Sequence, residues 1–285
     1  MSNYLVLQTD FGLVDGAVSA MYGVAYTVNP DIHIENLTHD IPPYDIWVAS
    51  YRLYQTVKYW PKGTVFVSVV DPGVGSDRKS IVAKTVSGHY IITPDNGSLT
   101  HIAHYEGLES VRLIDEVRSR LPHSEESHTF HGRDVYAYNG ARLASGEVTF
   151  EALGAGIPVS SIESLDMTDS VIEETIMKGS IDVLDVRFGS LWTNISSKLL
   201  KELDVQHGDH LMVTIYHLDK KVYQNIMAFA KSFADVNIGE PLVYVNSLVN
   251  LGVAVNQDSF SDLYNIGTGN DWSIHIRKAP KVIYE

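Results

Sequence analysis

The stretch YLVLQTDFGLVDGAVSAMYGVAYTVNP, residues 4–30, decides the fold class. It begins with a short apolar run, residues 4–9, which is typical of a buried strand. Apolar residues then recur at helical spacing from Ala17 to Val28, and Asn29 with Pro30 ends that helix. A strand followed by a helix indicates a layered α/β arrangement.

The same alternation continues through the first half of the chain. The further elements that we expect are strands at residues 32–37, 64–70, 80–86 and 89–93, and helices at residues 45–59 and 134–145. These strands are mostly apolar, which is typical of strands covered on both faces. The pattern therefore predicts an α/β protein with a three-layer N-terminal domain and a mostly parallel central sheet.

The second part of the chain has a different pattern. Short strands separated by turn signals are expected at residues 181–186, 211–216, 241–245 and 272–276, which predicts a compact β domain or a β-barrel. An acidic stretch from Glu163 to Glu174, with no base before Lys178, separates the two parts. We therefore expect an N-terminal domain at residues 1–160, a linker at 161–178 and a C-terminal domain at 179–285.

The charge and composition exclude several classes of protein. The 285 residues include 21 Lys and Arg against 35 Asp and Glu, a formal net charge of −14, and no base precedes Arg52. Because nucleic-acid binding needs basic residues that neutralise phosphates, we expect no nucleic-acid partner. The chain has no cysteine and no run near the ~20 apolar residues of a membrane span. Its first residues have neither the Arg-rich pattern of a presequence nor the basic and apolar regions of a secretory signal, so we expect no targeting segment there. We expect a soluble, cytoplasmic protein without membrane contact and with a cationic partner.

Polar side chains gather where predicted strands end or helices begin, which is where α/β domains bind ligands. The clusters are Asp10 and Asp15, His39 and Asp40, Asp71 and Arg78, Asp95 and Asn96, and residues 131–134 with His131 and Asp134. One cluster alone is as typical of a turn or a helix cap, and Asp15 is a natural N-cap for the helix that follows it. Five clusters on one edge indicate a functional site. The chain has no P-loop, no H-E-x-x-H motif and no G-x-G-x-x-G after its first strand.

In the second part, the segment DVRFGSLWTNI, residues 185–195, combines aromatic and polar side chains. Phe188 and Trp192 beside Asp185 and Asn194 would suit stacking on a nucleobase together with polar readout. Aromatic residues are also ordinary in the core of a β domain. Taken alone, the segment favours ordinary core aromatics over a nucleobase site.

Six motifs in fixed order carry a resemblance to a known family. They are TDFGLVDGAVSAMYG, THDIPPYDI, VVDPGVGSDRKSI, TPDNGSLT, TFHGRD and FGSLWTNI. With them the chain, from about Leu5 to about Ile276, resembles the S-adenosyl-L-methionine (SAM) hydroxide adenosyltransferases, which are SAM hydrolases related to bacterial fluorinases and chlorinases. The resemblance implies an N-terminal α/β domain, a C-terminal β-barrel and a homotrimer that binds SAM between neighbouring subunits. It implies neither a cofactor nor a metal ion.

The family's Asp–Arg–His catalytic set falls on Asp71, Arg78 and His131. Halogenases of this kind have Tyr where this chain has Asp71, so the set favours hydrolysis. SAM carries a sulfonium from which neutral methionine leaves, so the expected reaction is attack of water on ribose C5′ to give adenosine and L-methionine. Asp71 or His131 would take the proton of the water, while Arg78 would stay charged and orient Asp71.

The resemblance also implies a set of substrate-binding residues. They are Asp10, Asp15, Tyr44, Phe130, Asp185, Ser190, Trp192, Phe233, Ser247 and Asn256. Within this set, Asp15 corresponds to the carboxylate that holds the ribose diol, and Tyr44 to a position near the ribose. Asp185 corresponds to the residue that holds the methionine ammonium group, and Trp192 and Phe233 to aromatics that line adenine.

Two departures from the family's pattern concern adenine. Ser190 stands where the family usually has an Asn that contacts adenine. Gly252 and Asp258 interrupt the usual LEIAVN-x-G pattern. Adenine recognition is therefore the part of the resemblance that transfers least directly.

Three other interpretations stay open. Halide could replace water as the nucleophile, as in the halogenases. A metal-dependent hydrolase could draw oxygen and nitrogen ligands for Mn, Mg or Zn from Asp10, His39, Asp40, Asp71, His128 and His131. The chain could also be a non-catalytic SAM- or adenosine-binding module, although binding alone would not require Asp71, Arg78 and His131 together.

Overall fold

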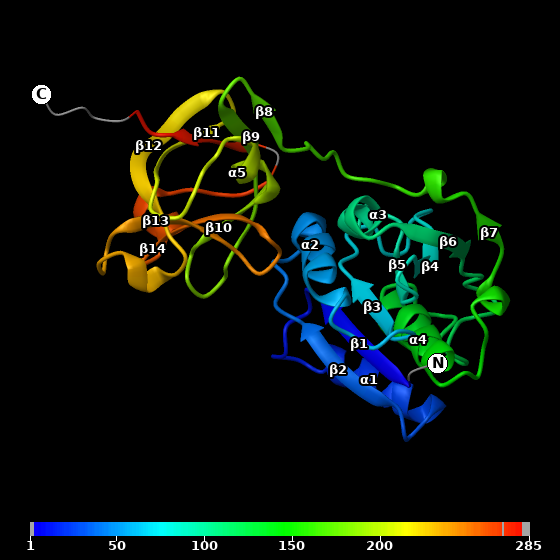
Figure 1. Ribbon diagram of the computed structural model, residues 1–285. Coiled ribbons are helices and arrows are strands. Elements are labelled where there is room, and N and C mark those ends of the chain that lie inside the picture. The colour runs from blue at the N-terminus through cyan, green and yellow to red at the C-terminus, as the bar shows by residue number, and fades with distance from the viewer. Residues whose placement is uncertain (1–2, 270, 281–285) are drawn as a thin grey trace, which may run out of the picture. The chain divides into compact units, whose positions relative to one another are not determined.

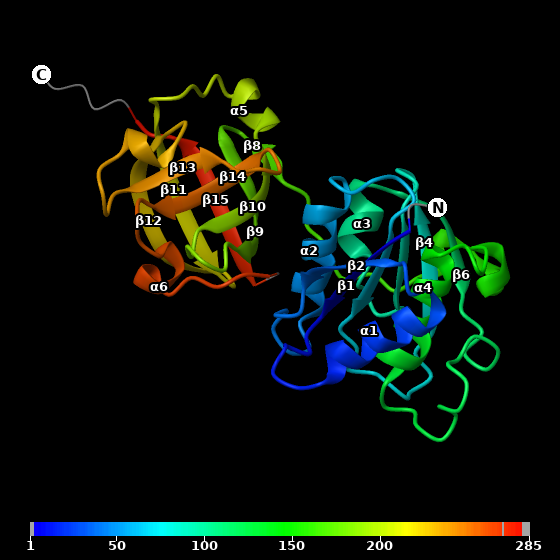
Figure 2. The ribbon, with the colours of Figure 1, turned by 90° about the horizontal axis from the view of Figure 1, so that it is seen from below.

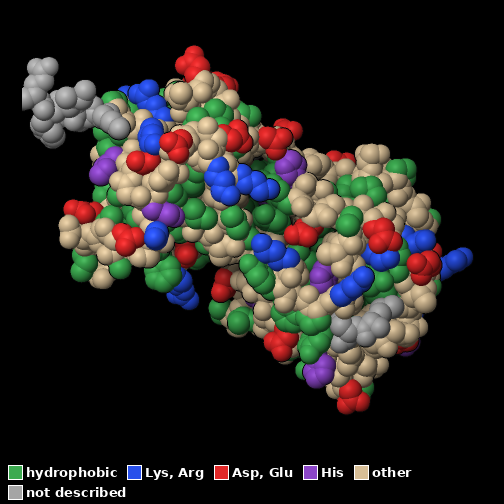
Figure 3. Space-filling model, viewed as in Figure 1, with side chains coloured by type: hydrophobic (Ala, Val, Ile, Leu, Met, Phe, Trp, Pro, Cys, Tyr) green, Lys and Arg blue, Asp and Glu red, His purple; other side chains and the backbone are tan. Residues whose placement is uncertain are grey.

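The computed structural model describes residues 3–269 and 271–280, and the chain divides into two compact units between Leu165 and Asp166 (Figure 1). Each unit has a hydrophobic core of its own. Within the described ranges, no helix is long and apolar enough to cross a membrane. On the face that Figure 3 shows, acidic and basic side chains are interspersed, so the acidic excess of the sequence forms no continuous patch there.

A seven-stranded sheet forms the middle of the first unit, in the order β2-β1-β3-β5-β4-β6-β7. Strands β2, β1, β3 and β5 pair in parallel, whereas β4 is antiparallel to both β5 and β6. The strands are β1 Tyr4–Thr9, β2 His33–Thr38, β3 Val65–Val69, β4 Ser80–Thr85, β5 Tyr90–Pro94, β6 Leu108–Leu113 and β7 Gly156–Ile157. The predicted α/β class with a largely parallel central sheet is confirmed.

Helices cover both faces of this sheet because successive side chains of each strand point to opposite faces. Along β1, Leu5 and Leu7 belong to the core that includes α1 and α4, whereas Val6 belongs to the core that includes α2 and α3 (Figures 1 and 2). The helical segments are α1 Ala17–Val28, α2 Ile46–Val57, α3 Thr100–Tyr105, a π-helix Gly132–Ala137, α4 Tyr138–Ala144, and 3₁₀ turns Glu151–Leu153 and Val159–Ser161. The three predicted layers are present.

The second unit is a closed β-barrel. Its strands follow the order β10-β14-β13-β12-β11-β15-β9, and pairing of β9 with β10 closes the ring, while β8 pairs with β9 alone. The elements are β8 Val171–Glu173, β9 Ile176–Leu184, β10 Leu191–Ser196, α5 Lys198–Glu202, β11 His210–His217, β12 Lys220–Phe229, a 3₁₀ turn Phe233–Asp235, β13 Pro241–Val245, β14 Asn250–Val255, α6 Phe260–Tyr264 and β15 Trp272–Lys278. The predicted barrel is confirmed, and its closure removes the exposed edges that an open sheet would have.

Two elements differ from their predicted form. The strand expected at residues 181–186 ends at Leu184, so Asp185 lies in the loop that follows. The helix expected at residues 134–145 begins earlier, as the π-helix, and the backbone N–H of Tyr138 donates to the carbonyl of Arg133 five residues before it. Apolar periodicity predicts a helix but cannot show this wider hydrogen-bond pattern.

Candidate active site

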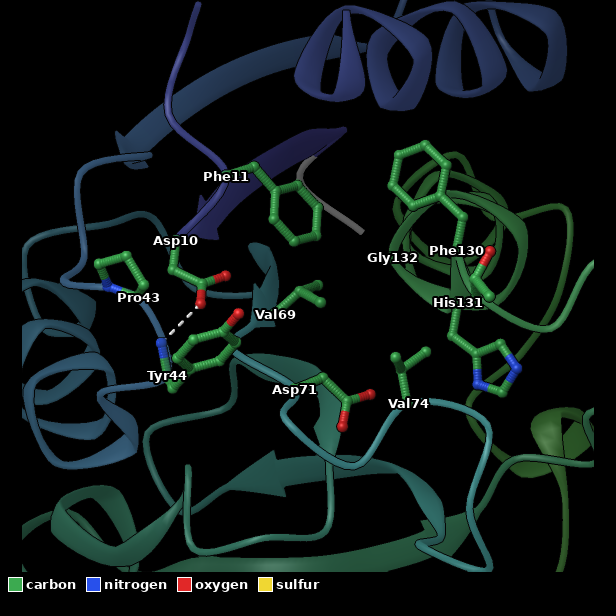
Figure 4. A pocket seen from close by; sticks show the side chains of 11 residues that line it. Asp10, Phe11, Pro43, Tyr44, Val69, Asp71, Val74, Phe130, His131 and Gly132 are labelled. Atoms are coloured by element: carbon green, nitrogen blue, oxygen red, sulfur yellow. Dashed lines mark hydrogen bonds between the residues drawn. The ribbon is translucent and has the colours of Figure 1, made fainter. Parts of the chain in front are cut away.

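The first unit has a pocket where β1 and β3 end and the π-helix begins. Its lining consists of Asp10, Phe11, Pro43, Tyr44, Val69, Asp71, Val74, Thr129, Phe130, His131 and Gly132, and its volume is ≈ 240 Å³. Because β1 and β3 are parallel neighbours, Asp10 and Asp71, which follow them, come to the same edge of the sheet. Figure 4 shows Asp10 and Tyr44 on one side of the pocket and Phe130 and His131 on the other.

Asp71 and Arg78 form an ion pair at this pocket. Asp71 Oδ2 lies 2.6 Å from Arg78 Nη2, and the two side chains are 5% and 9% exposed. Arg78 Nη1 also donates to the Lys79 carbonyl at 2.8 Å and to Ser80 Oγ at 3.2 Å. Burial raises the pKa of Asp71 above its ordinary value, and the charges of Arg78 and His131 act against this rise. The pocket thus contains a carboxyl group with increased proton affinity, held in place by a permanent cation.

His131 lies beside this pair. Its Nδ1 is 3.5 Å from Arg78 Nη2 and 3.9 Å from Glu116 Oε2. Its Nε2 is buried and makes no hydrogen bond with any residue in the described part of the chain. Burial and the guanidinium groups of Arg120 and Arg78 lower the pKa of His131, while the carboxylates of Glu116 and Asp71 act in the opposite direction. The imidazole is therefore neutral at pH 7 and able to accept a proton.

Asp10 fixes the opposite wall of the pocket. Its Oδ2 accepts a hydrogen bond from the backbone N–H of Tyr44 at 2.9 Å. Tyr44 has a φ of 69°, in the left-handed region that residues other than glycine rarely adopt. Its side chain is 72% exposed. The Asp10 hydrogen bond therefore stabilises a strained backbone that presents an aromatic ring at the rim of the pocket.

Phe11 and Phe130 form an apolar wall. Their ring centroids are 5.9 Å apart in an edge-to-face arrangement. A Cβ on Gly132 would lie 3.2 Å from the Phe11 ring, so glycine at this position leaves room for that ring. Gly132 is also the first residue of the π-helix, a type of segment that is frequent at functional sites.

Two residues of the predicted strand-end clusters support the surrounding loops. Asp15 is exposed and does not line the pocket; its Oδ1 accepts the backbone N–H of Ala17 at 2.9 Å. The N-cap position of α1 is Gly16, so the predicted cap at Asp15 is wrong by one residue. Asn96 Nδ2 donates to the carbonyl of Val70 at 2.9 Å, which holds the chain immediately before Asp71.

The side chains of the alternative metal site are not brought together. Among residues 3–269 and 271–280, no three His, Asp or Glu side chains are placed to share a metal ion. His39 is buried, with Nδ1 2.8 Å from Thr9 Oγ1 and Nε2 2.7 Å from Asn36 Oδ1. Both of its ring nitrogens are therefore engaged in hydrogen bonds.

A second cluster of predicted residues lies in the barrel, around Tyr244. Burial raises the pKa of Tyr244, the polar groups of Trp192 and Ser190 act against this, and the charge of Asp185 raises it further. The ring centroid of Phe233 lies 5.1 Å from that of Tyr244. Tyr244 thus connects the four predicted residues of this cluster.

Gly252 makes room for the Tyr244 ring. Gly252 on β14 lies opposite Tyr244 on β13 and opposite Trp192 on β10. A Cβ on Gly252 would lie 2.7 Å from Cε1 and Cζ of Tyr244, closer than packed atoms approach. A glycine in a strand often marks such a close approach. The departure from the family's pattern at Gly252 therefore has a structural reason in this chain.

The remaining two predicted residues follow β13 and β14. Ser247 is exposed in the turn after β13. Asn256 comes directly after β14, and its Nδ2 donates to the carbonyl of Val236 at 2.9 Å. Asn256 thus connects the end of β14 to the 3₁₀ turn that contains Phe233.

Comparison with protein families covers both units. Residues 5–154 match the SAM hydroxide adenosyltransferase N-terminal domain, and residues 179–273 match the SAM hydroxide adenosyltransferase C-terminal domain. The chain belongs to the SAM hydroxide adenosyltransferase family. The resemblance drawn from the six motifs is therefore confirmed.

Relatives of the family include both hydrolases and halogenases. The chain is 33% identical over 268 residues to an (R)-S-adenosyl-L-methionine hydrolase of Methanocaldococcus jannaschii, with 92% of each chain covered. It is 32% identical to the hydrolase of that name from Salinispora tropica, over 94% of this chain and 95% of the relative. It is 26% identical to a fluorinase of Nocardia brasiliensis, over 93% of this chain and 94% of the relative. The crystal structure of an uncharacterized conserved protein from Thermotoga maritima matches with a TM-score of 0.86 and 34% identity over 96% of this chain and 100% of that one.

In this member of the family, Tyr244 and Glu116 were missed by sequence reasoning. Tyr244 had one signal, the glycine at residue 252, but only the strand register places the two side by side. Glu116 is one acid among many in an acidic chain, and nothing in its local pattern relates it to His131.

Proposed function

We propose that this protein hydrolyses SAM to adenosine and L-methionine by in-line attack of water on ribose C5′. The observation that carries the proposal is the buried Asp71–Arg78 ion pair with His131 beside it, where Asp71 and His131 line one pocket. Four relatives that are 30–33% identical over nearly their full length are named (R)-S-adenosyl-L-methionine hydrolases, which supports the same reaction here.

The chemistry suits a site of this kind. The sulfur of SAM is positively charged, so it leaves as neutral methionine and requires no proton from the enzyme. In the reaction a C5′–O bond forms, the C5′–S bond breaks, and sulfur keeps the electron pair. What remains for the protein is to hold water in line with the C5′–S bond and to take its proton, and placement alone can contribute ~7–11 kcal/mol.

Asp71 and His131 together orient the attacking water and accept its proton. Asp71 Oδ1 is buried and has no hydrogen-bond partner among the described residues, and the same is true of His131 Nε2. The Asp71 oxygen can thus orient the water, and Nε2 can receive its proton in the tautomer that carries the ring proton on Nδ1, on the side of Glu116. Arg78 holds Asp71 and favours hydroxide character on the water by its charge.

The substrate roles in the first unit follow the position of each residue. Asp10 and Tyr44, at one wall of the pocket, would bind the ribose. Asp15, which is exposed in the loop that begins at Asp10, would bind the diol of the ribose. Phe130, packed against Phe11, would form the apolar wall beside the attacking water. An apolar wall strengthens electrostatic interactions by excluding bulk water.

The barrel cluster would bind the two ends of SAM. Asp185 would hold the methionine ammonium group, and Trp192 and Phe233 would stack on adenine. Ser247 would be a further substrate-binding residue of the barrel. Ser190 and the Tyr244 hydroxyl would supply the polar contacts that Asn gives elsewhere in the family. Asn256 would support this cluster through its bond to the Phe233 segment.

We further propose a cytoplasmic homotrimer in which the barrel of one subunit completes the pocket of its neighbour. The pocket volume of ≈ 240 Å³ lies below the ~300–1,000 Å³ of typical ligand sites, so one such pocket suits only the ribose and reacting atoms of SAM. Mass measurement in solution tests this assembly. A stable monomer with full activity would contradict it.

The decisive test of the reaction is incubation of the purified protein with SAM in ¹⁸O-labelled water. We expect adenosine and methionine in equal amounts, with the label at the 5′-oxygen of adenosine. A parallel incubation with excess chloride or fluoride tests halogenase chemistry, because a 5′-halogenated nucleoside would identify a halogenase. Tight SAM binding without any product would identify a binding module instead.

A further inference from the structure

Glu116 is a carboxylate beside the pocket that the reaction described above does not use. It lies in the segment after β6, and its side chain is 32% exposed. Glu116 Oε1 accepts a hydrogen bond from Ser80 Oγ at 2.5 Å, and Oε2 lies 3.9 Å from His131 Nδ1. The carboxylate is thus clamped at one oxygen and directed toward the histidine with the other.

Ser80 is the clamp that fixes Glu116. Ser80 Oγ lies 2.9 Å from Tyr136 Oη and accepts from Arg78 Nη1 at 3.2 Å. A serine hydroxyl has one proton, and an ionised carboxylate can only accept, so Ser80 donates to Glu116 and accepts a hydrogen bond from the Tyr136 hydroxyl. Burial raises the pKa of Tyr136, which keeps this tyrosine protonated and able to donate.

The charges around His131 explain why a second carboxylate matters. Four charged groups act on the imidazole: the guanidinium groups of Arg120 and Arg78, and the carboxylates of Glu116 and Asp71. Asp71 is bound to Arg78 at 2.6 Å, so the charges of these two largely cancel at His131. Arg120 is in turn 3.8 Å from the buried carboxylate of Asp134, which offsets part of its charge. Glu116 is the remaining negative group next to Nδ1, and it opposes the part of the Arg120 charge that acts on an imidazolium.

We propose that Glu116 is a positioning residue that stabilises the protonated form of His131 when the imidazole takes the proton of the attacking water. The kinetic part of this inference depends on the proposed hydrolysis, whereas the link between Glu116 and His131 does not. Glu116 does not touch the pocket itself, so its removal changes proton transfer and leaves substrate binding unchanged.

The link is tested by NMR titration of the histidine rings, with the His131 signal assigned from His131→Ala. In Glu116→Gln the pKa of His131 falls by about 0.7 pH units, the effect of two unit charges about 4 Å apart in water. Ser80→Ala, which releases the clamp and keeps the carboxylate, gives a smaller fall. Glu116→Asp keeps the charge on a shorter side chain and also gives a smaller fall than Glu116→Gln. Glu147→Gln removes an exposed carboxylate paired with Arg142 and is the matched control without effect.

Turnover gives the second readout. In Glu116→Gln, kcat falls by roughly 5-fold, the equivalent of 0.7 pH units, with KM unchanged and the acid limb of the pH profile moved to lower pH. An unchanged His131 pKa in both Glu116→Gln and Ser80→Ala overturns the proposal, and so does an effect on KM alone. If the wild type forms no adenosine, the proposed function fails while the NMR titration still decides the role of Glu116.

Discussion

Asp71 in the first unit and Asp182 in the barrel are both buried carboxyl groups whose pKa is raised, yet their surroundings differ. Asp71 is paired with Arg78 at 2.6 Å and lines a pocket. Asp182 on β9 is 2% exposed and accepts a hydrogen bond from Ser180 Oγ at 2.7 Å, and burial raises its pKa to about 7. A raised pKa therefore does not by itself mark a catalytic group; the adjoining cation and pocket distinguish Asp71.

Replacing each of the two carboxyls by an amide separates their roles. Asp71→Asn removes the proton acceptor and the partner of Arg78, so we expect kcat to fall by at least ~100-fold while SAM still binds. Asp182→Asn should keep turnover close to that of the wild type. Chromatography of adenosine measures the first quantity, and calorimetric titration with SAM measures binding. Turnover within a factor of about ten of the wild type in Asp71→Asn would refute the role given to Asp71.

Asp182 should instead control how stability depends on pH. Its pKa is 3.8 in an unfolded chain and about 7 when folded, so the folded state holds the proton more tightly. The stability contributed by this group is complete below about pH 4 and is lost as pH rises toward 7. Between pH 5 and pH 8 the wild type should lose about 2–3 kcal/mol that Asp182→Asn does not lose.

Urea unfolding of both proteins at pH 5 and at pH 8 measures this difference. A gap between wild type and Asp182→Asn that is the same at both pH values would contradict the assignment. Turnover should be unaffected in either case, because Asp182 does not line the pocket.

The parts of this molecule that sequence predicts best are those with local causes. The apolar run at residues 4–9 forms β1 as expected, and Asp10 follows it at the pocket because strand ends share an edge. The Tyr244–Gly252 contact depends on the register of β13 against β14, which no local pattern contains. Glu116 reaches His131 only through the packing of the segment after β6, so its contribution could not be foreseen either.

In the barrel, a substitution at Gly252 tests the close packing of the Tyr244 ring. Gly252→Ala places a methyl group within 2.7 Å of the Tyr244 ring and should displace it. We expect a loss of ~1–3 kcal/mol in stability, as for other overpacked sites, and a raised KM for SAM with less change in kcat. Thermal unfolding and steady-state kinetics measure these effects.

Gly23→Ala is the matched control for Gly252→Ala. Gly23 lies within α1, and a Cβ there meets nothing within 4 Å. Alanine should stabilise the helix by up to ~1 kcal/mol and leave KM unchanged. If Gly252→Ala behaved like this control, the steric role of Gly252 would be wrong.

The smallest expected effect concerns metal removal. The side chains of the alternative metal site are engaged otherwise, with Asp71 bound to Arg78 and His39 bound through both ring nitrogens. Prolonged treatment with a chelator should therefore leave the rate of adenosine formation unchanged. A loss of activity that added Mn²⁺, Mg²⁺ or Zn²⁺ restores would favour the metal-dependent alternative.

The π-helix Gly132–Ala137 has a consequence for how this site can change during evolution. Each residue of an α-helix advances the chain by about 100° around the axis. A one-residue deletion that turned this segment into regular α-helix would rotate His131 by about that angle relative to α4, away from Asp71 and Arg78. The direction of the imidazole is therefore set by the length of the segment as well as by its side chains. Deletion variants would reveal this dependence on length, which substitutions do not change.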